Sequence, residues 1–223
     1  MQNIVAIGGG GFSQEPENLA LDRYILSIAR GKKVCFIPTA SADNQGYIDR
    51  FHEAYGSLGC ETSHLSLYWP HRLDFDDFMI EQDLIYVGGG NTRNLLVLWR
   101  DWGLDTAIRK AYENGTVLAG VSAGANCWFE EFSTDSMGPL APWKGLGWLK
   151  GSYCPHYDGE VDRRPSLKRM LESGEIGSGL ACEDHTAVHF VDEELHRCIS
   201  SNAGSKVFRV DVSGEVELET ILV

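Results

Sequence analysis

The stretch Gly120-Val121-Ser122-Ala123-Gly124 matches the pattern G-x-S-x-G, in which a serine occupies a sharp turn between a strand and a helix. Residues 116–119 before it are apolar and predict a short buried strand, and the apolar run 125–132 after it predicts the start of a helix. Glycine on both sides of the serine avoids a clash between a Cβ and the neighbouring strand or helix. The context predicts Ser122 as a nucleophile, and a plain glycine-rich turn is the alternative.

Upstream of this turn, short apolar runs alternate with segments of helical spacing. We expect strands at 3–7, 34–38, 61–68 and 84–87, and helices at 18–29, 47–58, 91–99 and 103–114. Strands that are apolar throughout and alternate with helices indicate an α/β fold, with a mainly parallel sheet and helices on both faces. Ligands bind such a sheet at the carboxyl ends of its strands, where Ser122 and two glycine clusters fall.

The last third of the chain has a different pattern. Residues 137–157 are rich in Gly, Pro and Trp and predict a long loop, and residues 163–173 predict a helix. We expect strands at 180–192, 196–200, 206–212 and 216–223, with antiparallel pairing among them. Because no repeat or linker interrupts the pattern, we expect residues 1–223 to form a single domain.

Composition narrows the classes of partner and location. The net charge of −13, from 32 acidic and 19 basic residues, argues against nucleic acid as a partner. The N-terminus lacks the pattern of a signal peptide, and no apolar run reaches 18 residues, so we expect no contact with a membrane. The six cysteines form no C-x-x-C pair, which predicts no zinc site and fits reduced thiols in the cytoplasm.

A serine nucleophile needs a base and an acid that orients the base. His156 lies in the segment Tyr-Cys-Pro-His-Tyr after the predicted loop, where the preceding proline fixes the backbone. A surface histidine is the alternative there. For the acid, Glu183 and Asp184 follow an apolar strand, and Asp135 and Asp158 lie in loops.

The glycine cluster 88–90, followed by Asn91 and Thr92, ends another predicted strand. Its backbone N–H groups can face an anion, since glycine adopts conformations with positive φ. We expect half of an oxyanion hole here, with the N–H of Ala123 as the other half. A tight turn or a phosphate loop is the alternative, but neither glycine cluster completes a nucleotide-binding motif.

Three motifs in this order resemble peptidase E and its relatives: I-Y-V-G-G-G-N-T at 85–92, G-V-S-A-G-A at 120–125 and C-P-H-Y at 154–157. This is the aspartyl dipeptidase family of serine peptidases, which includes the cyanophycinases. The resemblance runs from Ile4 to about Phe208, and F-I-P-T-A at 36–40 also fits. It implies a three-layer, flavodoxin-like sandwich similar to the class I glutamine amidotransferase domains, with serine in place of their cysteine nucleophile.

The resemblance also implies roles for residues. Ser122 would be the nucleophile and His156 the general base, and Ala123 would bind the oxyanion with Gly89 or Gly90. An acidic residue after a late strand completes a Ser-His-Glu triad in the family. The matching segment here makes Glu183 the preferred acid, and a shift of one residue would give the role to Asp184.

Further residues follow from the same comparison. Asp135 lies in a segment similar to one that carries an aspartate in the family, displaced by one position, and it would assist the site or contact substrate. Arg164, or its neighbour Arg163, would bind a substrate carboxylate; a surface arginine is the alternative. Asn91 and Thr92 would lie against the substrate.

We therefore expect a cytoplasmic serine peptidase that hydrolyses short peptides, above all dipeptides with N-terminal aspartate, and that requires no metal or cofactor. Two alternatives stay open at this stage. One is another serine hydrolase on the same scaffold, either an esterase or an isopeptidase of the cyanophycinase kind. The other is a noncatalytic protein that binds a small molecule. The sequence leaves the oligomeric state open, with a homodimer as one candidate.

Overall fold

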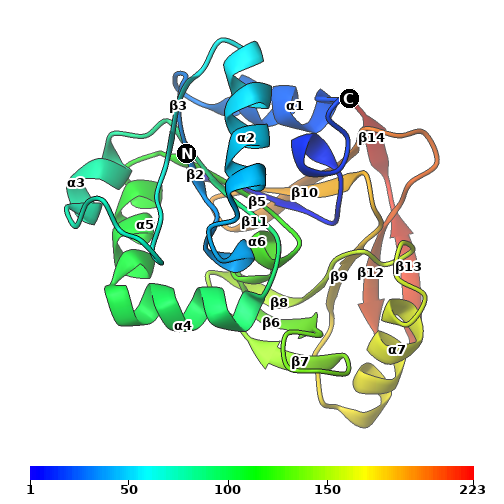
Figure 1. The fold of residues 1–223 in the computed structure, drawn as a ribbon. Helices are drawn as coiled ribbons and strands as arrows, with labels where there is room; N and C mark the ends of the chain where they lie inside the picture. Colours follow the sequence, from blue (N-terminus) through cyan, green and yellow to red (C-terminus); the bar gives the residue numbers. More distant parts are fainter.

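The computed structural model describes residues 1–223, and its centre is an eight-stranded, mainly parallel sheet (Figure 1). The apolar runs of the first half form its parallel strands, as their pattern predicted. Two late strands join antiparallel next to the N-terminal strand. The strands lie in the order β14 (Thr220–Leu222), β11 (Glu194–Ser200), β10 (Thr186–Val191), β1 (Asn3–Ile7), β5 (Val117–Val121), β4 (Leu84–Val87), β2 (Lys33–Ile37) and β3 (Glu61–His64).

Both faces of this sheet are buried. Successive side chains of a strand point to opposite faces, so each strand contributes to two apolar clusters. In β1, Ile4 and Ala6 belong to one apolar cluster, and Val5 and Ile7 belong to the other. The first cluster packs against α3 (Phe75–Ile80), α4 (Thr92–Trp102) and α5 (Leu104–Glu113), and the second packs against α1 (Ala20–Ile28) and α2 (Gln45–Ser57). Figure 1 shows these two groups of helices on opposite sides of the strands.

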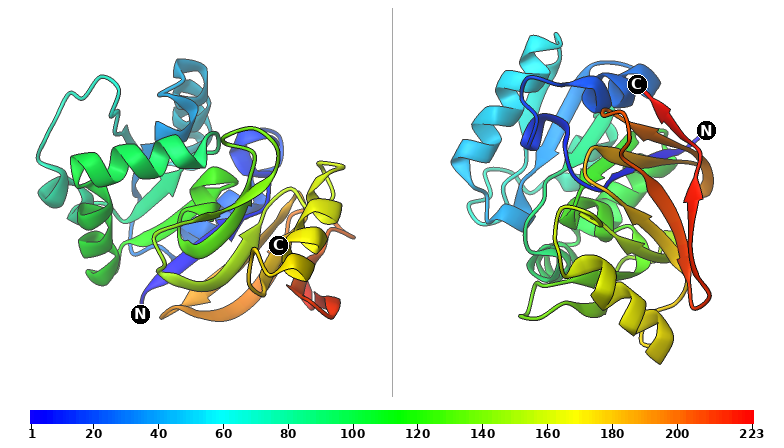
Figure 2. Two further views of the ribbon diagram at one scale, coloured as in Figure 1. Left: turned by 90° about the horizontal axis from the view of Figure 1, so that it is seen from below. Right: turned by 90° about the vertical axis from the view of Figure 1, so that its right-hand side faces the viewer.

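A second sheet of six strands packs on the face that carries α4 and α5. Its outer surface is covered by α7 (Arg163–Ser173), which contributes Leu167 and Met170 to a third apolar cluster. In both views of Figure 2, α7 and the hairpin of β12 (Val207–Asp211) and β13 (Gly214–Leu218) lie far from α2. The strand order is β13 (Gly214–Leu218), β12 (Val207–Asp211), β9 (Gly179–Cys182), β8 (Leu149–Cys154), β6 (Phe129–Thr134) and β7 (Ala141–Lys144).

This second sheet corrects two predictions. Residues 137–157 are not one long loop, because β7 and β8 lie within them. The helix after Ser122, α6 (Ala123–Asn126), has only four residues and gives way to β6. The strand β7 pairs with β6, which precedes it in the chain, and β8 pairs with β6 and with the more distant β9. A local pattern carries little information about such pairing.

The parallel strands β1, β4 and β5 end at the same edge of the main sheet. The chain leaves them at Gly8, Gly88 and Ser122 in turn. The predicted nucleophile and both glycine clusters are thereby brought together at that edge. None of the helices has the length and apolar character needed to cross a lipid bilayer.

Candidate active site

Ser122 occupies a strained turn between β5 and α6. Its backbone has φ 54° and ψ −110°, a conformation that non-glycine residues rarely adopt. Two close approaches hold the turn: a Cβ on Gly120 would lie 2.2 Å from the carbonyl oxygen of Gly124, and a Cβ on Gly124 would lie 2.2 Å from that of Val87. The Ser122 N–H donates to the carbonyl of Ile7 at 3.0 Å. The G-x-S-x-G pattern thus folds as a tight turn from a strand into a helix.

His156 lies just beyond the end of β8, and its side chain is almost completely buried. Its backbone also has a positive φ, of 52°, and its N–H donates to the carbonyl of Gly8 at 3.3 Å. The Nδ1 atom of His156 lies 2.7 Å from Oδ1 of Asp184, within hydrogen-bond distance. This contact, the largest cause, holds the pKa of the Asp184 carboxyl below its ordinary value, so the carboxylate is ionised at neutral pH.

The acid in contact with His156 is thus Asp184, and Glu183, the acid preferred from the sequence, faces elsewhere. Glu183 accepts a hydrogen bond from the N–H of Lys206 at 2.8 Å through its Oε2 atom. Burial raises the pKa of the Glu183 carboxyl. Both acids lie in the turn between β9 and β10, which the Thr186 N–H closes by donating to the carbonyl of Glu183 at 3.3 Å, and this turn directs the Asp184 carboxylate toward the histidine. The N–H of Asp184 is itself held by the Asp158 carboxylate at 2.8 Å.

The glycine cluster after β1 makes room for this pair. A Cβ on Gly9 would lie 1.9 Å from Oδ1 of Asp184 and 2.9 Å from Nδ1 of His156. A Cβ on Gly159 would lie 2.3 Å from the other carboxylate oxygen of Asp184. A side chain at either position would therefore displace the acid. The glycines at 8–11 are visible in the sequence, but the pattern indicates only the end of a strand and does not indicate that an acid fills the space beside them.

Ser122 and His156 line the same cavity, of about 240 Å³. No hydrogen bond joins Ser122 Oγ to the imidazole here, and such bonds are often long before a substrate is bound. The other lining residues are neutral except for one arginine, and none of them is acidic. They are Ser13, Gln14, Tyr47, Arg50, Gly89, Gly90 and Val121.

The predicted oxyanion groups surround the serine. A Cβ on Gly89 would lie 3.4 Å from the Cβ of Ser122, so the Gly89 backbone passes next to this serine. The Gly89 N–H donates to the hydroxyl of Tyr47 at 3.3 Å. Gly90 has a φ of 136°, and a Cβ there would collide with the carbonyl oxygen of Ala40. Ala123 is the first residue of α6, so its N–H has no acceptor within the helix.

Asn91 and Thr92 line another part of the structure. The Asn91 amide accepts from the N–H of Asn94, which caps α4, and donates to the carbonyl of Ser136 at 2.9 Å. The Thr92 N–H donates to the Ser136 hydroxyl at 3.0 Å. Asp135 is mostly exposed, and its nearest cation is Arg163 at 3.9 Å. None of Asn91, Thr92 and Asp135 is among the residues that line the cavity of Ser122.

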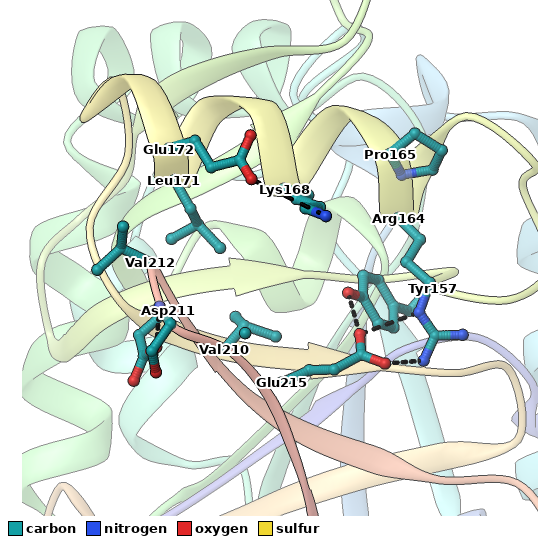
Figure 3. Close-up of a pocket in the computed structure, with 12 residues that line it drawn as sticks. Tyr157, Arg164, Pro165, Lys168, Leu171, Glu172, Val210, Asp211, Val212 and Glu215 are labelled. Atoms are coloured by element: carbon teal, nitrogen blue, oxygen red, sulfur yellow. Dashed lines mark hydrogen bonds and ion pairs between the residues drawn. The ribbon is translucent and has the colours of Figure 1, made fainter.

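Arg164 lies in a separate cavity of about 600 Å³ between α7 and the β12–β13 hairpin (Figure 3). Its guanidinium forms two hydrogen bonds with Glu215, at 2.6 and 3.0 Å, and stacks over the rings of Tyr157 and Phe208. Arg163 is buried and bonds to Glu160 and to the carbonyl of Ser133. The structure does not bring either arginine to the cavity that contains Ser122.

Two lining residues of that cavity escaped the sequence analysis. Tyr47 and Arg50 lie one turn apart on α2, and the Arg50 guanidinium lies 5.2 Å from the centre of the Tyr47 ring. Their spacing in a predicted amphipathic helix gave no functional signal, because tyrosine fits the apolar face and arginine the solvent face. The structure contains no cluster of three His, Cys, Asp or Glu side chains placed to hold a metal ion.

A serine on a strained turn that shares a cavity with a histidine paired with an aspartate is typical of α/β enzymes with a side-chain nucleophile at the carboxyl edge of the sheet. Comparison with known proteins defines the group further. The model of peptidase family S51 matches residues 4–198, and the chain belongs to this family. It is thus a peptidase by family.

Two curated relatives and one solved structure illustrate the similarity. An uncharacterized peptidase of Bacillus subtilis, YgaJ, is 54% identical over 212 residues, which cover 94% of this chain and 92% of the relative. Peptidase E of Streptomyces coelicolor is 30% identical over 76% of this chain and 75% of its own length. The crystal structure of a peptidase from an acI-B1 actinobacterium has the same fold, with a TM-score of 0.75 at 18% identity, over 99% of this chain and 95% of that one.

Proposed function

We propose that this protein is a serine-type peptidase in which Ser122 is the nucleophile, His156 the general base and Asp184 the acid that orients the base. The observation that carries the proposal is the joint geometry of the three residues. Ser122 lies on a strained elbow and shares a cavity with His156, whose Nδ1 is paired with Asp184 at 2.7 Å. The proposed triad is therefore Ser-His-Asp, and it replaces the Ser-His-Glu triad inferred from resemblance.

The pairing with Asp184 keeps the proton of the neutral imidazole on Nδ1, which leaves Nε2 free to accept one. His156 takes the proton of Ser122 Oγ as the oxygen attacks the scissile carbonyl carbon. The carbonyl oxygen becomes an oxyanion, and the N–H groups of Ala123 and of Gly89 or Gly90 stabilise it. His156 then gives its proton to the leaving amine, the C–N bond breaks, and a water molecule hydrolyses the acyl-enzyme by the same steps.

For Gly89 this proposal has a structural consequence. Its N–H now donates to the Tyr47 hydroxyl at 3.3 Å, a long hydrogen bond that an oxyanion would replace with a stronger, charge-assisted one. Each donor of an oxyanion hole contributes about 3 to 4 kcal/mol to the transition state.

The proposed substrates are short peptides, most of all dipeptides with N-terminal aspartate. The small cavity of about 240 Å³ supports a short substrate, and the relatives named peptidase E support the peptide class. Residues 91, 92 and 135 line no part of this cavity, so we assign them to the turn that supports α4 and not to substrate binding.

Two experiments on wild type and Ser122→Ala test the proposal. A fluorophosphonate probe, which loses fluoride to a nucleophilic serine, reports the nucleophile whatever the substrate is. Aspartyl-p-nitroanilide and Asp-Leu, with alanyl and glutamyl analogues, report specificity. We expect labelling and turnover in wild type alone, with turnover largely confined to the aspartyl substrates.

The outcomes separate the parts of the proposal. Labelling without hydrolysis of any peptide would refute the substrate and favour an ester or an isopeptide. Equal labelling of Ser122→Ala and wild type would refute the nucleophile. Absence of both labelling and turnover in wild type would favour a noncatalytic binding protein.

A further inference from the structure

Arg50 is the one lysine or arginine side chain that lines the cavity of Ser122 and His156. It lies in the middle of α2, whose opposite face packs Ile48, Phe51 and Tyr55 into the core. The backbone position is therefore fixed by packing, while the side chain itself is exposed. The helix thus presents an exposed cation to the cavity.

The guanidinium of Arg50 packs against Tyr47, which in turn contacts the backbone beside the nucleophile. The guanidinium carbon lies 5.2 Å from the centre of the Tyr47 ring, within the range of a cation–π interaction. The hydroxyl of the same tyrosine accepts the hydrogen bond from Gly89 N–H. This chain of contacts links the position of the cation to the proposed oxyanion site.

Arg50 forms no ion pair, since no carboxylate lies within 4.0 Å of it. Glu17 and Glu53 line a neighbouring hollow that Arg50 also borders, and neither forms an ion pair with it. Arg164 differs in this respect, because Glu215 already occupies its guanidinium with two hydrogen bonds (Figure 3). Of these two arginines, only Arg50 is free to bind an anion.

We propose that Arg50 binds the side-chain carboxylate of the acidic residue whose carbonyl Ser122 attacks. This inference rests on the proposed function and names the residue that selects its substrate. A guanidinium can bind a carboxylate through two parallel hydrogen bonds, which a neutral amide cannot match. In a protein of net charge −13, a cavity without acidic lining and with one unpaired arginine favours an anionic substrate.

The test compares aspartyl- and asparaginyl-p-nitroanilide, which differ in charge but hardly in shape and carry no terminal carboxylate. We expect Arg50→Gln to lower kcat/KM for the aspartyl substrate about 10- to 100-fold and to leave the asparaginyl rate nearly unchanged. Arg50→Lys keeps the positive charge but cannot form two parallel hydrogen bonds, so its kcat/KM for the aspartyl substrate should lie between those of wild type and Arg50→Gln. The matched control is Arg23→Gln, an exposed helical arginine of α1 with no ion pair, which should keep the wild-type ratio.

A binding measurement tests the role of Arg50 without requiring turnover of the substrate. Calorimetry of Asp-Leu and Asn-Leu on Ser122→Ala, with and without Arg50→Gln, should show a preference for Asp-Leu only when Arg50 is present. Arg50→Gln with an undiminished preference in both assays would overturn the inference. So would a loss of preference in Arg164→Gln with Arg50→Gln unaffected, or no preference in wild type. If Ser122 were still labelled by the fluorophosphonate in those cases, its proposed role as the nucleophile would be unaffected.

Discussion

The choice between the adjacent acids 183 and 184 can be decided by two isosteric substitutions. Asp184→Asn keeps the shape of the side chain that lies 2.7 Å from Nδ1 of His156, but removes its charge. The Asn amide can also present an N–H to Nδ1, which would move the ring proton to Nε2. In that tautomer His156 cannot accept the proton of Ser122.

The expected loss has two sources. A hydrogen bond to a charged group contributes about 1.5 to 3 kcal/mol, and the wrong tautomer adds to the loss because the base is then unavailable. Together we expect kcat/KM to fall about 10³- to 10⁴-fold, which corresponds to about 4 to 5.5 kcal/mol. Glu183→Gln keeps a carbonyl oxygen that can accept from Lys206 N–H, so we expect a change of less than about threefold.

The assay is kcat/KM for aspartyl-p-nitroanilide, together with the rate of fluorophosphonate labelling, which reports serine reactivity without regard to specificity. Thermal unfolding of each variant controls for loss of the fold. Full labelling in Asp184→Asn combined with little labelling in Glu183→Gln would refute the structural argument. That result would instead favour Glu183, the acid that the resemblance indicated.

Two further predictions concern residues around the site. Gly9→Ala places a Cβ 1.9 Å from Oδ1 of Asp184, so we expect at least about a 100-fold loss of kcat/KM; Gly56→Ala, with open space around it in α2, should keep full activity and control for the extra methyl group. Equal activity of the two variants would contradict this. Burial raises the pKa of Asp22, which accepts from Phe12 N–H at 2.9 Å, to about 6. Its stabilising contribution is therefore present below pH 4 and lost as the pH rises to 6, by up to about 3 kcal/mol relative to Asp22→Asn in urea unfolding at each pH. Parallel pH profiles of the two proteins would refute this assignment.

The sequence predicted those parts of the fold that depend on local pattern. The strands at 3–7 and 84–87 have the predicted bounds, because each is apolar throughout and ends at glycine. The helix at 163–173 also has the predicted bounds. Strands β7 and β8 were missed because their residues include Pro142 and Gly151, and Gly151 has a φ of 80°. Such segments are strands only because a neighbouring strand supplies their hydrogen bonds.

The residues of the candidate site also differ in whether a local pattern or long-range packing determines their positions. Ser122 could be proposed as the nucleophile from the sequence because its turn is a local structure that two glycines permit through close contacts. The acid could not be chosen from the sequence, because the conformation of the turn between β9 and β10 decides which of Glu183 and Asp184 reaches His156. Arg164 was placed near the substrate by resemblance, but its position depends on packing between α7 and a distant hairpin, where Glu215 is its partner.

Glycine relieves a different close contact in each of the two glycine clusters and in the G-x-S-x-G turn at the carboxyl edge of the sheet. Gly9 leaves the space that the carboxylate of Asp184 fills, Gly90 lets backbone pass against the carbonyl of Ala40, and Gly120 with Gly124 allows the turn at Ser122 to approach its neighbours. In each case a methyl group would meet an atom of the site or of its support. The geometry of the proposed site therefore depends on the absence of side chains at these glycines as well as on the side chains that are present. A glycine cluster at a strand end is informative once the group that occupies its space is known, and only the fold supplies that group.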